Sequence, residues 1–150
     1  DLSIAASTRR FDLPAFASPV NAQLGEAIAL TGYSIEGSTD DAALAVELVW
    51  QALGEPAGNY KVFVHLLDES GQLVAQSDAE PADGYRTGSW IPGEVIVDTH
   101  ELPLPADAAG AYRLLAGLYD PVSGVRLPAT ASDGMLYADD AVELGTWTAE

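Results

Sequence analysis

LAVELVWQA, residues 44–52, has large apolar side chains at every second position. These are Leu44, Val46, Leu48 and Trp50, and they alternate with Ala45, Glu47, Val49 and Gln51. Its two polar residues, Glu47 and Gln51, fall on the same phase of the alternation. Because successive side chains of a β-strand point to opposite faces, this period of two predicts a strand with one face in a core. Glu47 should therefore face solvent, and Trp50, which lies on the apolar phase, should be a core residue.

Similar patterns recur along the chain between turn signals, and no long stretch carries apolar residues at helical spacing. One of these turns, Asp-Glu-Ser-Gly at 68–71, separates two apolar runs and predicts a hairpin. The expected strands are residues 27–35, 44–52, 60–67, 72–78, 95–102, 112–119 and 142–148, with a short one near 125–127. We therefore predict an all-β fold, an antiparallel β-sandwich of about eight strands, immunoglobulin-like or jelly-roll-like.

Length and composition indicate one domain. The chain has 150 residues, of which 48% are hydrophobic, and this suffices for one core spanning residues 1–150. Residues 1–21 read as an edge strand or a linker, with 2–16 as the segment that would add the strand. The longest irregular stretch, 79–93, is rich in Pro and Gly and should cross an end or an edge of the sheets, where a binding loop would sit well.

Charge and composition exclude several functions. With 23 Asp and Glu against 6 Lys and Arg, the net charge is -17, which makes nucleic acid and anionic membranes poor partners but leaves cations open. The absence of cysteine excludes disulfides, thiolate catalysis and thiolate zinc sites. There is no apolar run of membrane-spanning length and no signal-peptide pattern, so we expect no membrane insertion by this chain.

Most catalytic motifs are missing. Neither a Walker phosphate loop nor G-x-G-x-x-G occurs, and there is no G-x-S-x-G nucleophile turn. The two histidines, His65 and His100, both fall inside expected strands, which argues against a Ser-His-Asp triad and favours a pairing with a carboxylate or carbonyl. A glycosidase pair of carboxylates stays open among so many acids, although a solvated acidic surface is favoured.

Acidic residues at turns and strand ends leave a structural calcium ion open, since carboxylate and carbonyl oxygens are its ligands. No EF-hand loop is present, and no other cofactor is expected. The candidate ligands are Asp68, Glu69, Asp78, Glu80, Asp83, Asp120, Asp133, Asp139 and Asp140.

Several segments mix aromatic and polar residues in a way that a core alone does not require. Trp90, in the Gly/Pro-rich loop, offers a flat apolar ring with an N–H donor, as stacking against a sugar needs. His65 and Gln76 should meet on one face of the 60–78 hairpin. The expected ligand-binding residues are Trp90, His65, Gln76, Asp78, Asp98 and Tyr119. In the alternative, Trp90 caps the open end of the sandwich, and Arg86 or Arg126 neutralises a buried aspartate.

A set of motifs carries a family resemblance. They are LTGYSI at 30–35, LVWQA at 48–52, YKVFVHLLD at 60–68, QSD at 76–78, TGSW at 87–90, GE at 93–94, AGLYD at 116–120 and RLP at 126–128. As a set they resemble a soluble domain that follows the membrane-embedded part of certain bacterial glycosyltransferases of the protein-mannosyltransferase-like class. The match runs from Ala22 to Thr148.

The resemblance implies an extracytoplasmic domain, secreted or at the cell surface, tethered in its parent protein to a transmembrane portion. In that family the transfer chemistry belongs to the transmembrane portion, so transferase activity does not carry over to this chain. The resulting expectation is a non-catalytic accessory domain that binds a carbohydrate or a glycosyl acceptor. A purely structural or protein-interaction domain, and a glycoside-active enzyme, are the two alternatives.

Overall fold

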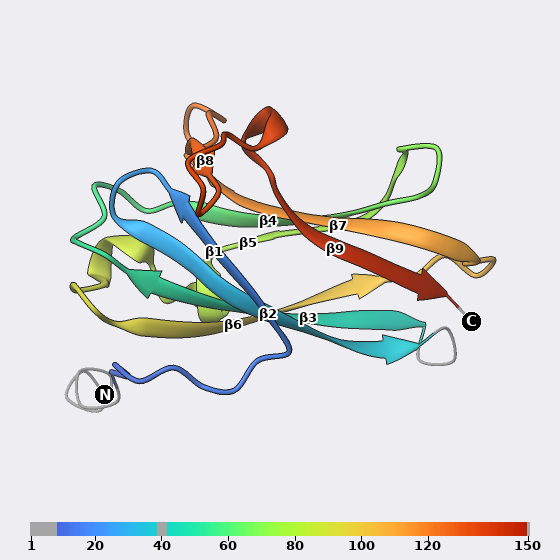
Figure 1. The fold of residues 1–150 in the computed structure, drawn as a ribbon, viewed down its shortest axis with the longest axis horizontal. Coiled ribbons are helices and arrows are strands. Elements are labelled where there is room, and N and C mark those ends of the chain that lie inside the picture. Colours follow the sequence, from blue (N-terminus) through green and yellow to red (C-terminus); the bar gives the residue numbers. More distant parts are fainter. Residues whose placement is uncertain (1–8, 39–41, 150) are drawn as a thin grey trace.

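Two antiparallel sheets pack face to face in the computed structural model, which describes residues 9–38 and 42–149 (Figure 1). The strands are β1 (Ser18–Leu24), β2 (Ile28–Ser38), β3 (Ala43–Ala52), β4 (Lys61–Leu67), β5 (Leu73–Ala79), β6 (Val95–Pro103), β7 (Gly110–Tyr119), β8 (Ala129–Thr130) and β9 (Val142–Ala149). The first sheet has the order β6-β3-β2-β1-β8 and the second β5-β4-β7-β9. The predicted all-β sandwich is thus confirmed, with nine strands where about eight were expected.

The alternation in β3 builds the core as predicted. Its inward residues, from Leu44 to Trp50, are fully buried, and each such side chain contributes about 1.5–3 kcal/mol through burial. Trp50 lies opposite Leu30 of β2 and Ile96 of β6, on the inner face of the first sheet. Glu47 points to the outer side of the same sheet and is half-buried.

The N-terminal part differs from the expectation of an edge strand over residues 2–16. Residues 1–8 lie outside the described part of the chain, and 9–17 contribute a single bridge, Arg10 to Val95, while the strand β1 begins only at Ser18. Pro19, which lacks an N–H, and Asn21, with a φ of 56°, interrupt the pairing of β1 with β2, although the burial of β1 still alternates with a period of two.

The segment before β1 crosses the outside of the first sheet. Phe16 packs against Gly32 so closely that a Cβ there would overlap its ring. Val49, directly opposite Gly32, is fully buried on this outer side. A glycine in a central strand marks such a close approach.

The short strand expected near 125–127 is reduced to an antiparallel bridge against the end of β7, with hydrogen bonds from the Asp120 amide to the Val125 carbonyl and from the Leu127 amide to the Leu118 carbonyl. Only Arg126 forms a bridge there, to Tyr119, and the two-residue β8 follows it. The Asp120 carboxylate accepts the Val122 N–H, and Gly124 has a φ of 78°, so residues 120–124 form a tight turn that returns the chain alongside the end of β7.

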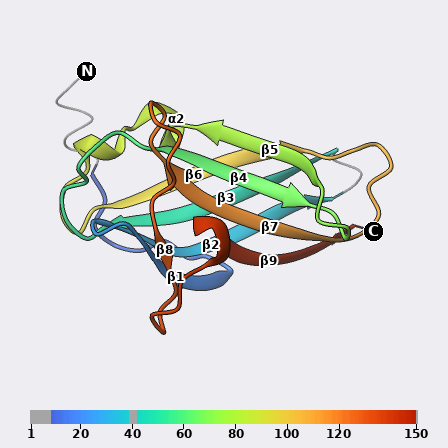
Figure 2. The same cartoon turned by 90° about the horizontal axis from the view of Figure 1, so that it is seen from above.

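The 79–93 stretch crosses an edge of the sandwich, as expected. It contains the single turn α2 (Pro81–Gly84) and the 3₁₀ turn η2 (Thr87–Ser89). Figure 2 shows α2 beside the end of β5 and close to β6, the edge strands of the two sheets. A second 3₁₀ turn, η3 (Ala138–Asp140), precedes β9.

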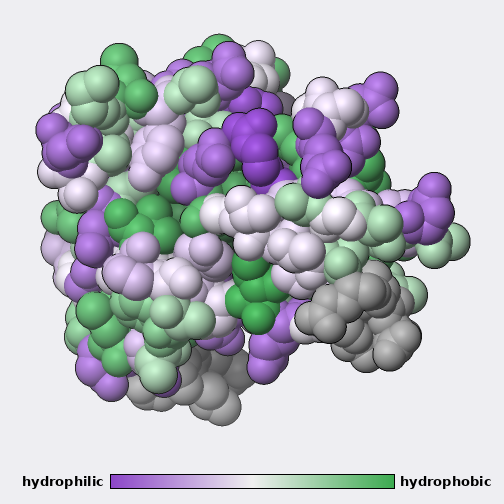
Figure 3. Space-filling view, turned by 45° about the vertical axis from the view of Figure 1, so that its right-hand side comes forward, coloured by the Kyte–Doolittle hydropathy of each residue, from purple (hydrophilic) through white to green (hydrophobic). Residues whose placement is uncertain are grey.

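The surface mixes hydrophilic and hydrophobic residues. On the face drawn in Figure 3, the hydrophobic residues form separate patches among hydrophilic ones. No helix within the described ranges is long and apolar enough to cross a membrane.

Candidate functional site

Four of the six expected ligand-binding residues share the outer face of the second sheet. Gln76 of β5 lies directly opposite His65 of β4, and Asp78 lies opposite Phe63. Tyr119 of β7 lies opposite Lys61 at the start of β4 and projects to the same side. The residues between them, such as Val62 and Val64, point into the core. We call the set of Phe63, His65, Gln76, Asp78 and Tyr119 the β4 face.

Phe63 is the packing centre of the β4 face. Its ring centroid lies 5.0 Å from that of His65 and 6.4 Å from that of Tyr119, both in tilted arrangements. The guanidinium of Arg126 lies 4.2 Å above the Phe63 ring and also donates to the Asp139 carbonyl at 3.0 Å. Phe63 is therefore almost completely buried, while the rings of His65 and Tyr119 remain half-exposed.

The environment sets the protonation state of two groups on this face. Burial, and then the positive charge of Arg126, lower the pKa of His65 from 6.5, while Asp78 acts in the opposite direction. Burial, and then the charge and hydrogen bond of Asp78, raise the pKa of Tyr119 above 10.0. At neutral pH the β4 face therefore presents an uncharged imidazole and a protonated phenol.

These groups can recognise a polyhydroxylated ligand. The Gln76 amide offers donors and an acceptor, the Asp78 carboxylate accepts, and the imidazole and phenol can each do both. Gln76 and Asp78 are exposed, so their hydrogen-bonding groups are open to solvent. Half-exposed rings beside such groups provide the apolar surface on which a sugar ring packs.

Trp90 and Asp98 do not belong to this face, which corrects the expected set. Trp90 is 1% exposed, and its indole N–H donates to the Tyr85 carbonyl at 3.1 Å. Asp98 is also 1% exposed, because it sits at an inward position of β6. A ring in a Pro/Gly-rich loop can fold inward as easily as outward, and here it packs into the core.

Asp98 instead ties the two sheets together. Its carboxylate accepts hydrogen bonds from the Trp50 indole N–H (3.1 Å) and the Ala82 amide (2.8 Å) and contacts His100 Nε2 at 2.7 Å. His100 Nδ1 lies 2.8 Å from Ser77 Oγ on β5. The network thus joins β3, β5, β6 and α2, and it holds Ala82 in a left-handed conformation with a φ of 49°.

The sequence argued against a Ser-His-Asp triad and favoured the pairing of each histidine with a carboxylate or a carbonyl, and His100 is indeed paired with Asp98. Ser77, His100 and Asp98 do form a chain of contacts, but the His100 side chain is only 2% exposed. Ser77 faces inward on β5 and lines neither of the two pockets described below. The three residues act here as an internal hydrogen-bond network.

A second buried carboxylate, Glu94, was not recognised from the sequence. Its side chain is 2% exposed, and it pairs with Arg9 at 2.6 Å and accepts the Tyr85 hydroxyl at 2.6 Å. Burial and Glu94 raise the pKa of Tyr85 to about 12. Because Arg9 and Glu94 are 85 residues apart, no local pattern could reveal the pair.

The arginines expected to neutralise a buried aspartate have other partners. Arg86 pairs with Glu80 at 3.2 Å on the surface. Arg126 stacks on Phe63, as described above. Asp98 is held by hydrogen-bond donors and His100 instead.

Two of the turn acids considered for calcium, Asp68 and Asp133, accept hydrogen bonds within their own turns. The Asp68 carboxylate accepts from the Ser70 and Gln72 amides, and that of Asp133 accepts from the Met135 amide. Within residues 9–38 and 42–149, no group of three or more His, Asp and Glu side chains is arranged to hold a metal ion.

Two pockets lie away from the β4 face. One of about 580 Å³ opens on the outer side of β3 and β6, between Arg10 and Tyr85. The other, of about 570 Å³, lies at one end of the sandwich between the β1–β2 turn and Tyr60. Its lining is mostly apolar, with Glu26 and Glu55 as its two acidic residues.

No protein-family model and no curated protein matches the chain. Among solved structures, it is similar to the crystal structure of a Bordetella pertussis protein provisionally designated ApaA. The TM-score is 0.44 and the sequence identity 15%, over 89% of this chain and 96% of that one. Similarity at this level gives no information on function.

Proposed function

We propose that the chain is a non-catalytic, extracytoplasmic accessory domain that binds a carbohydrate or a glycosyl acceptor through the β4 face. The observation that carries the proposal is the cross-strand arrangement of His65, Gln76, Asp78 and Tyr119 on one side of the second sheet. Three strands thereby bring two half-exposed rings next to an exposed amide and an exposed carboxylate.

The physical chemistry favours a neutral, hydroxyl-rich ligand. An anionic ligand would meet Asp78 within a chain of net charge -17. Binding through a few hydrogen bonds and half-exposed rings predicts a weak, aromatic-dependent affinity. The accessory and extracytoplasmic parts of the proposal rest on the resemblance to the glycosyltransferase-associated domain.

A purely structural or protein-interaction role is the second candidate, and one observation favours it. Trp90 and Asp98, which were expected to contact ligand, stabilise the 79–93 stretch instead. If the β4 face binds no ligand, its rings and the Arg126 guanidinium would be a further stabilising cluster of the same kind.

A glycan-array screen of the purified chain, with calcium and with a chelator, tests the proposal. Gln76→Ala and Tyr119→Ala should each weaken any hit by about tenfold, which corresponds to one lost hydrogen bond or ring contact. Gln23→Ala, an exposed glutamine on β1, is the matched control and should bind like the parent.

Three other results would count against the proposal. An array without hits would favour the structural role, and hits that survive both substitutions would place the binding elsewhere. Release of free sugar from a bound glycan would favour the glycoside-active alternative.

A further inference from the structure

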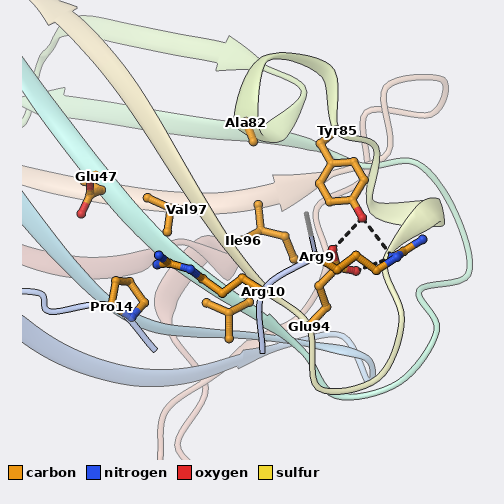
Figure 4. A pocket seen from close by; sticks show the side chains of 10 residues that line it. Arg9, Arg10, Pro14, Glu47, Ala82, Tyr85, Glu94, Ile96 and Val97 are labelled. Carbon is orange, nitrogen blue, oxygen red and sulfur yellow. Dashed lines mark hydrogen bonds and ion pairs between the residues drawn. The ribbon is translucent and has the colours of Figure 1, made fainter. Parts of the chain in front are cut away.

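A second candidate site is the pocket on the outer side of β3 and β6, which shares no residue with the β4 face. Its lining includes Arg9, Arg10, Glu47, Tyr85 and Glu94, over a floor formed by residues 95–97 of β6. We call it the arginine pocket. Its volume of about 580 Å³ is in the range of small-molecule sites. Figure 4 shows two ends, with Arg9, Tyr85 and Glu94 at one and Arg10 and Glu47 toward the other.

The first end is already neutralised. Glu94 accepts from Arg9 and from the Tyr85 hydroxyl, both at 2.6 Å, and from the Ile91 amide at 3.1 Å. Arg9 also donates to the Tyr85 oxygen at 3.0 Å. Arg9, Tyr85 and Glu94 form hydrogen bonds with one another, so we do not expect this end of the pocket to bind a charged ligand group.

The second end is different. Within the described part of the chain, no carboxylate lies within ion-pairing distance of the Arg10 guanidinium, and no cation lies within that distance of Glu47. The other four arginines all have partners, which are Glu94 for Arg9, Glu80 for Arg86, Glu143 for Arg113, and Phe63 with the Asp139 carbonyl for Arg126.

The opposite charges of Arg10 and Glu47, at the same end of the pocket, restrict the charge that a ligand can carry there. A simple anion would meet Glu47 and the field of a chain with net charge -17. A simple cation would meet Arg10. A ligand with both charges and none overall satisfies both groups, since a guanidinium pairs well with a carboxylate and Glu47 can accept from an ammonium.

The floor adds an apolar requirement. Val95 and Val97 lie on the outer side of β6, and Pro14 closes the pocket from the N-terminal segment. We propose that the arginine pocket binds a free amino acid with an apolar side chain, its carboxylate on Arg10, its ammonium on Glu47 and its side chain on Val97, which unlike Val95 is only half-buried. This site is independent of the β4 face.

Three matched probes test the proposal by NMR titration of the ¹⁵N-labelled chain. L-leucine should shift the amides of residues 95–97 saturably, with a dissociation constant on the order of 1 mM. N-acetyl-L-leucine lacks the ammonium and L-leucinamide lacks the carboxylate, so each should bind at least about tenfold more weakly.

Substitutions identify the two charged groups. Arg10→Gln and Glu47→Gln should each weaken leucine binding by about tenfold or more. Arg113→Gln, which changes an exposed arginine of the second sheet, should leave it unchanged. The proposal would be overturned if about 50 mM leucine caused no saturable shift, because this concentration is at least ten times the largest dissociation constant expected here. So would equal binding of all three probes, or unchanged binding to both pocket variants.

Discussion

Gly117 is the residue on which the β4 face depends most closely. It lies opposite Phe63 on β7, and a Cβ at this position would overlap the Phe63 ring and lie 3.1 Å from the Asp140 carbonyl. The ring is held from above by Arg126, so it has little room to move away. The absence of a side chain at residue 117 therefore allows the aromatic cluster to pack flat against the sheet.

Gly117→Ala should lower the free energy of unfolding by about 1–3 kcal/mol, because it overpacks a filled space. Chemical denaturation measures the loss. Gly54→Ala is the control, since a Cβ there meets only Ala27 at 3.9 Å and its φ is not left-handed. Equal stability of the two variants would contradict the packing described for Phe63.

His65 should titrate below its ordinary pKa of 6.5, because burial and Arg126 disfavour the charged imidazole. The unfolded chain then binds more protons than the folded one below pH 6.5, so His65 contributes stability that is present above that pH and lost as pH falls through the folded pKa. NMR titration of the imidazole signals, assigned with His65→Asn, measures the value. A measured pKa at or above 6.5 would contradict the conclusion that burial and Arg126 disfavour the charged imidazole.

At the scale of elements, the 79–93 stretch depends on buried carboxylates. Asp98 anchors α2 through the Ala82 amide, and Glu94 anchors the following turn through Arg9 and Tyr85. Each carboxylate has lost water and gained several donors, so removing one leaves those donors without a partner.

Asp98→Ala should destabilise the fold by about 3–5 kcal/mol, because it leaves the Trp50 indole, the Ala82 amide and His100 unsatisfied in the core. Glu143→Ala is the control. It breaks an ion pair with Arg113 in which both side chains are about half exposed, and it should cost no more than about 1 kcal/mol. Thermal or chemical unfolding of both variants checks the difference, and similar losses would contradict the role of the Asp98 network.

The elements also show what sequence patterns can and cannot predict. The alternation in 44–52 predicts β3 and its core face, and the hairpin turn at 68–71 correctly predicts His65 opposite Gln76. β1 was missed although Val20, Ala22 and Leu24 alternate with Asn21 and Gln23, because Pro and Asn are depleted in strands. The burial of Trp90 and the pairing of Arg9 with Glu94 depend on segments distant in sequence, which no local pattern describes.

At the scale of the whole molecule, the surplus of 17 negative charges opposes the compact state through self-repulsion. Raising NaCl from about 10 mM to about 500 mM shortens the Debye length from about 30 Å to a few ångströms, so the melting temperature should rise by several degrees at pH 7. At pH 4, near the pI of about 4.1, the same salt change should have a much smaller effect. An equal rise at both pH values would exclude self-repulsion as the cause.

The most direct test of the β4 face is an NMR titration of the ¹⁵N-labelled chain with the strongest glycan from the array. We expect saturable shifts at the amides of β4, β5 and β7 around His65, Gln76 and Tyr119, with no effect around the buried Trp90. Shifts confined to another surface, or no shift at any glycan concentration, would contradict the assignment of this face as the binding site.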